Sequence, residues 1–110
     1  MMTLKIICDD GKELSYKRVS ADLQRDDKDD GCLWLKFTVR DDKKKNGDRN
    51  IEITYRVHTD IREPDCEKIY NVIKARISEG SLFEIEEYLR RSYIYIEYGG
   101  TRYQFTAQKL

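Results

Sequence analysis

Tyrosine and arginine side chains interleave in the last third of the sequence, and this pattern carries the clearest binding chemistry in the chain. Six residues contribute to it: Tyr88, Arg90, Arg91, Tyr93, Tyr95 and Arg102. Such side chains dominate the energetics of protein interfaces, and tyrosine rings also stack on nucleic-acid bases. The pattern therefore predicts a partner-binding surface if the rings are exposed. The alternative is that the tyrosines pack beneath a helix with only their hydroxyls outward.

A second candidate contact is the basic run Lys43, Lys44 and Lys45, which is joined by Arg49. Three aspartates lie within the same stretch, so its local charge is nearly balanced. Non-specific nucleic-acid binding needs a contiguous positive patch, because counterion release supplies most of its affinity. The run is consequently a weak nucleic-acid signal and a secondary candidate for protein contact.

The residues that usually perform catalysis are sparse. His58 is the only histidine, and it falls on the polar side of an alternating strand pattern. The sequence has no G-x-S-x-G nucleophile elbow and no glycine-rich phosphate loop. Cys8, Cys32 and Cys66 form no C-x-x-C pair, and the patterns around Cys8 and Cys66 predict inert thiols in the core. We expect no enzyme activity, no catalytic residue and no cofactor.

Four Asp-Asp pairs raise the question of a metal site, since Ca²⁺ and Mg²⁺ prefer clustered carboxylates. The best candidate loop runs from Asp26 to Gly31. If Gly31 takes the sixth position of an EF-hand loop, Lys28 occupies a ligand position and Phe37 replaces the bidentate glutamate. These pairs are better explained as solvated loop tips that discourage edge-to-edge association, so no metal site is predicted.

The first half of the chain predicts four antiparallel strands in a meander. Alternating apolar residues mark strands at 3–8, from Glu13 to Leu23, at 33–39 and at 51–58, with a D-G turn after the first. The alternation slips by one residue near Arg18, where a β-bulge would exchange the two faces. Charged segments at 25–31 and 41–49 separate the later strands.

The second half predicts a helix and a closing hairpin. A helix from Pro64 to Glu79 has its apolar stripe at Cys66, Ile69, Tyr70, Ile73 and Ile77, and Gly80 follows as its C-terminal cap. The hairpin pairs 93–98 with 101–107 through Gly99-Gly100. Ile94 and Ile96 face one side of it, and Tyr93 and Tyr95 face the other.

The segment 81–92 is ambiguous between helix and strand. As a helix, it has a Ser81/Glu84 capping box and a stripe of Leu82, Ile85 and Leu89. As a strand, it would place Glu87 on the same side as Phe83, Ile85 and Leu89, which buries a charge. We therefore expect a short second helix here. The predicted fold is a single α+β domain over residues 1–110: an antiparallel sheet of four-strand meander plus C-terminal hairpin, with one main and one short helix.

Composition narrows the functional classes. The chain has 110 residues, with 21 Lys and Arg against 21 Asp and Glu, and no apolar run approaches the length of a membrane span. An odd cysteine count without a visible secretory signal indicates a reducing cytoplasm. The balanced charge disfavours indiscriminate polyanion binding.

These observations predict a non-catalytic protein-binding module, such as a small stoichiometric inhibitor or adaptor of the kind encoded by phages and mobile elements. Single-stranded nucleic-acid binding through the same tyrosines is one alternative, and a homo-oligomer subunit that pairs through an exposed hairpin edge is another.

Overall fold

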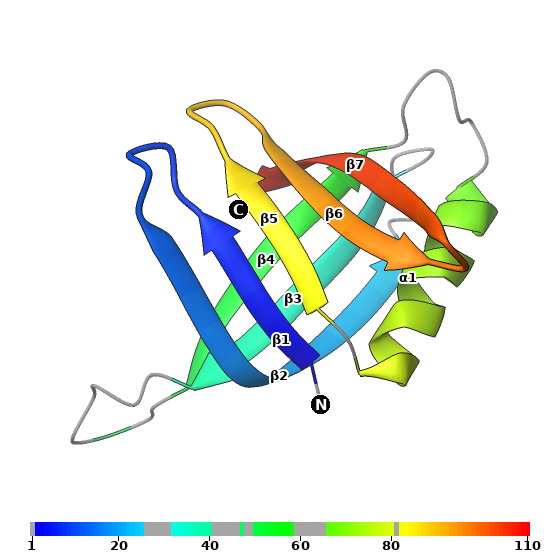
Figure 1. Cartoon of the computed structure of the whole chain (residues 1–110), viewed down its shortest axis with the longest axis horizontal. Coiled ribbons are helices and arrows are strands. Elements are labelled where there is room, and N and C mark those ends of the chain that lie inside the picture. Colours follow the sequence, from blue (N-terminus) through cyan, green and yellow to red (C-terminus); the bar gives the residue numbers. More distant parts are fainter. Residues whose placement is uncertain (1, 26–31, 41–46, 48–49, 59–65, 81) are drawn as a thin grey trace.

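The described residues form a closed seven-stranded β-barrel with one helix against it (Figure 1). The computed structural model describes residues 2–25, 32–40, 47, 50–58, 66–80 and 82–110. In order around the barrel the strands are β1, β2, β3, β4, β7, β6 and β5, and β5 returns to β1. This architecture corrects the α+β open sheet expected from the sequence.

The meander of the first half is present as predicted. It consists of β1 (Met2–Ile7), β2 (Glu13–Arg25), β3 (Cys32–Arg40) and β4 (Asn50–His58), and each strand is antiparallel to the next. β3 and β4 pair over their whole length, from Cys32 with His58 to Arg40 with Asn50. The segments 26–31 and 41–46, which contain three of the four Asp-Asp pairs, lie outside the described residues.

The predicted slip near Arg18 is a genuine bulge in β2. Met2 pairs with Val19 but Leu4 pairs with Tyr16, so an advance of two residues on β1 matches an advance of three residues on β2. Arg18 adopts a left-handed backbone conformation with φ of 59°. The extra residue exchanges the faces of β2, which brings both Leu4 and Val19 into the core.

The single described helix, α1 (Cys66–Glu79), ends where the sequence predicts and packs against β6, β2 and β3. Its inward residues Ile69, Val72 and Ile73 are buried in the same core as the strand side chains. Gly80 follows with φ of 71°, and its N–H donates to the carbonyl of Ile77 at 3.2 Å. Pro64 and Asp65, the predicted start, lie outside the described residues.

The predicted second helix is wrong: residues 82–87 form strand β5 (Leu82–Glu87). Phe83 and Ile85 alternate into the barrel and are fully buried. The charge that argued against a strand is satisfied, because the Glu87 carboxylate accepts a hydrogen bond from the Tyr55 hydroxyl at 2.7 Å. Leu89 lies beyond the end of the strand and is 91% exposed, so it does not join Phe83 and Ile85 in the core.

The remaining strands, β6 (Ser92–Tyr98) and β7 (Thr101–Lys109), form the predicted hairpin. Gly99 and Gly100 both have positive φ, as a two-residue type I′ turn requires. β5 pairs antiparallel with β6 and parallel with β1, while β7 pairs with β4. Antiparallel neighbours alternate in direction, so a ring of seven strands needs a parallel pair to close. The β1–β5 pair meets that need.

Candidate functional site

Tyr93 and Tyr95 lie on the outer surface of the barrel. They alternate along β6 with Ile94 and Ile96, which are 0% and 2% exposed inside it. Both tyrosines are half-buried, and their cross-strand neighbours on β5 and β7 flank them. We call Tyr88, Tyr93 and Tyr95, with the adjacent Arg90, Arg91 and Arg102, the tyrosine face.

The turn between β5 and β6 holds Tyr88 in a fixed position at one end of this face. The backbone N–H of Tyr88 donates to the carbonyl of Arg91 at 2.9 Å. Its hydroxyl donates to a carboxylate oxygen of Glu86, also at 2.9 Å. Its ring meets the Tyr93 ring edge to face, with centroids 5.6 Å apart. These contacts fix the Tyr88 ring against its neighbours within the turn.

An open depression lies beside this turn and encloses about 820 Å³. Tyr88, Leu89, Arg90, Arg91 and Tyr93 line it, and Asp9 comes from the loop after β1. The parallel pairing of β1 with β5 explains this neighbour, because parallel strands end at the same edge of a sheet. In Figure 1 the β1–β2 loop and the β5–β6 turn accordingly lie at the same end of the barrel.

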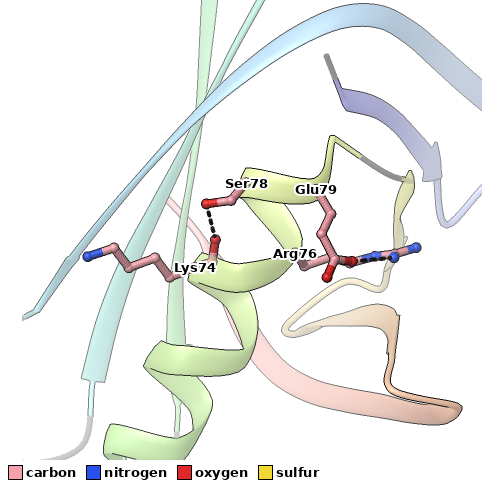
Figure 2. Close-up of polar contacts among 4 residues, drawn as sticks. All are labelled: Lys74, Arg76, Ser78 and Glu79. Carbon is pink, nitrogen blue, oxygen red and sulfur yellow. Dashed lines mark hydrogen bonds and ion pairs between the residues drawn. The ribbon is translucent and has the colours of Figure 1, made fainter.

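The other end of the tyrosine face reaches α1. The guanidinium of Arg102 lies over the Tyr95 ring, 4.7 Å from its centroid, in a cation–π contact. A smaller pocket of about 140 Å³ separates this pair from Arg76 of α1. Figure 2 shows the last turn of α1, where Arg76 pairs with Glu79 at 3.4 Å and Ser78 donates to the carbonyl of Lys74.

Carboxylates are interspersed among the aromatic rings. Glu84 and Glu86 on β5 are cross-strand neighbours of Tyr95 and Tyr93, and Glu97 is the neighbour of Arg102. The hydrogen bond to Glu86 raises the pKa of the Tyr88 hydroxyl, and burial raises that of Tyr95, with Glu86 adding to the effect. Both hydroxyls therefore remain protonated near neutral pH. The face is amphipathic and mixed in charge.

The structure brings six of the nine predicted contact residues onto this one face, namely Tyr88, Arg90, Arg91, Tyr93, Tyr95 and Arg102. Lys43, Lys44 and Lys45 lie outside the described residues. Sequence reasoning missed Leu89, Asp9 and Arg76. The sequence pattern puts Leu89 in a helical stripe, and Asp9 is distant in the sequence, so only the β1–β5 pairing reveals that the two residues are close.

A second cluster of titratable groups lies at the end of β5. The Tyr55 hydroxyl donates a hydrogen bond to the Glu87 carboxylate, and the Lys109 ammonium forms an ion pair with the same carboxylate at 3.6 Å. Burial and the Glu87 carboxylate raise the pKa of Tyr55 far above its ordinary value. Partial burial, with the same carboxylate, raises the pKa of the Cys8 thiol, which lowers its thiolate fraction. These contacts stabilise the barrel and do not activate a nucleophile.

Among residues 2–25, 32–40, 47, 50–58, 66–80 and 82–110, no three His, Cys, Asp or Glu side chains gather as a metal site. The helix in that same part of the chain is too short and too polar to cross a membrane. Comparison with protein-family models, curated proteins and solved structures found no match for this chain.

Proposed function

We propose that this chain is a non-catalytic protein-binding module, acting as a small stoichiometric inhibitor or adaptor, and that the tyrosine face is its contact surface. The observation that carries the proposal is the ordered row of partly exposed rings on β6 and the adjoining turn. Tyrosine and arginine are enriched among the residues that contribute most to interface affinity. A cytoplasmic location is part of the proposal and is supported by the odd cysteine count, which is typical of proteins in a reducing compartment.

The carboxylates favour a protein partner over a single-stranded nucleic acid. Glu84, Glu86 and Glu97 lie among the rings on which bases would stack. A nucleic-acid backbone would approach these charges closely and lose the electrostatic attraction that supplies most of its affinity. The homo-oligomer alternative has less support, since β5 pairs with the hairpin over Ser92–Tyr95 and β4 pairs with it over Thr106–Lys109, which leaves a shorter edge for a second copy.

The test is affinity capture from the native host's lysate, followed by mass spectrometry. Tyr93→Thr/Tyr95→Thr is the test variant, because threonine keeps strand propensity while removing the rings. Trp34→Thr is the matched control, since Trp34 is a half-buried outward residue of β3 with Arg56 over its ring at 5.9 Å.

We expect wild type and Trp34→Thr to retain the same protein, and the double variant to lose it while keeping its circular dichroism spectrum. Equal retention by all three chains refutes the proposed surface. An oligothymidylate titration provides the second arm: binding that weakens steeply with salt would favour the nucleic-acid alternative.

A further inference from the structure

The depression beside the β5–β6 turn combines an apolar centre with a rim of net positive charge. Leu89 is 91% exposed, and the rings of Tyr88 and Tyr93 lie beside it. An apolar side chain exposed to this extent on an ordered turn gains free energy when a partner covers it.

The rim is positive because its two arginines have no ion-pair partner among the described residues. Arg90 and Arg91 are exposed, and neither forms an ion pair with any residue in the described part of the chain. The nearest glutamate on β5 is engaged, since Glu86 accepts the hydroxyl of Tyr88. Among the described residues that line the depression, Asp9 is the one carboxylate, so two cations face one anion there.

From this complementarity we propose that the depression binds a segment of the partner protein in which carboxylates flank an apolar side chain. The apolar side chain would cover Leu89 and the Tyr88 and Tyr93 rings. The flanking carboxylates would receive paired N–H bonds from Arg90 and Arg91, the geometry that guanidinium groups favour. This inference rests on the proposed function and specifies the chemistry of the partner.

The first experiment measures binding of synthetic 12-residue peptides to the intact chain by fluorescence polarisation. Each peptide has one central Leu, Ile, Phe or Trp and four flanking Asp or Glu residues. The comparison peptides have Gln or Lys at the flanking positions. We expect acid-flanked peptides alone to bind, to shift the amide resonances of residues 88–93, and to weaken as salt rises.

Variants of the chain then test each part of the depression. Arg90→Glu/Arg91→Glu and Leu89→Asp should each weaken the best peptide by roughly tenfold or more. Lys17→Glu/Lys68→Glu is the matched control: it changes the net charge as much as the arginine pair at exposed sites on β2 and α1, and should leave affinity nearly unchanged.

Three results would overturn the inference. These are no binding by any acid-flanked peptide at millimolar concentration, equal binding by the Gln-flanked peptides, and affinity that survives both the arginine and leucine variants. Capture of the natural partner by the same variants separates failure of this inference from failure of the proposed function. If Tyr93→Thr/Tyr95→Thr loses the captured protein while Arg90→Glu/Arg91→Glu and Leu89→Asp retain it, the binding face stands and the acidic-segment inference falls.

Discussion

Replacing the buried Tyr55 hydroxyl tests why residues 82–87 are a strand. Tyr55 is fully buried, and its hydroxyl donates to the Glu87 carboxylate at 2.7 Å. Tyr55→Phe deletes this donor. Glu87, whose side chain is 18% exposed, then keeps the ion pair with Lys109 at 3.6 Å. A hydrogen bond to a charged group is worth about 1.5–3 kcal/mol, so we expect a loss in that range.

A double-mutant cycle isolates the interaction. Glu87→Leu leaves the Tyr55 hydroxyl buried without its acceptor, which should cost about 1–3 kcal/mol. In Tyr55→Phe/Glu87→Leu both polar groups are gone, so the combined loss should be smaller than the sum of the single losses by about 1 kcal/mol or more.

The assay is urea unfolding followed by circular dichroism, with free energies of unfolding compared at equal slope. Thermal melts provide a check, since each kcal/mol corresponds to about 4–8 °C for a domain of this size. Glu87→Gln keeps an acceptor oxygen and should lose less than Glu87→Leu. Additivity of the two single losses within about 0.5 kcal/mol would refute the argument that this pair compensates the buried charge.

Three further predictions concern stability. Ile73→Ala should cost about 2–5 kcal/mol in urea unfolding because Ile73 is 0% exposed, and a loss below about 1 kcal/mol would mean that α1 is not held against the barrel. Arg18→Gly should be neutral or stabilising, while Arg18→Val should cost more than about 1 kcal/mol, since φ at this bulge is 59°; equal melting temperatures would contradict the bulge. Alkaline titration should destabilise wild type more than Tyr55→Phe above about pH 10. Because its raised pKa keeps Tyr55 protonated in the folded state, the stabilisation by Tyr55 is complete below the pKa of tyrosine in the unfolded chain and is lost as the pH rises above that value. Parallel curves of unfolding free energy against pH for the two chains would contradict this.

Local patterns predicted those elements whose signals agree with each other. Alternation gave the meander and the hairpin, and the slip of that alternation located the bulge at Arg18. The spacing of Ile69 and Ile73 gave α1, and the outward position of Tyr93 and Tyr95 followed from the inward position of Ile94 and Ile96. These inferences hold because each depends on which side of one element a residue occupies.

The prediction for residues 82–87 is wrong because the local sequence signals of this segment conflict. Ser81 and Glu84 match a helix cap, and a strand puts Glu87 inward. Tyr55 resolves the conflict, but it lies 32 residues away in the sequence, and no local pattern connects the two. Intrinsic propensity is a weak preference that pairing with β1 and β6 overrides.

The sequence alone therefore determined where most elements lie, which of their faces are apolar and that Tyr93 and Tyr95 face outward, because these properties depend on side chains a few positions apart. Tertiary structure decided that the sheet closes through the β1–β5 pair, that Glu87 can face inward, and that Asp9 and Leu89 line one depression. Closure depends on backbone hydrogen bonds between strands about 80 residues apart, and those bonds leave no periodic trace in the order of the amino acids.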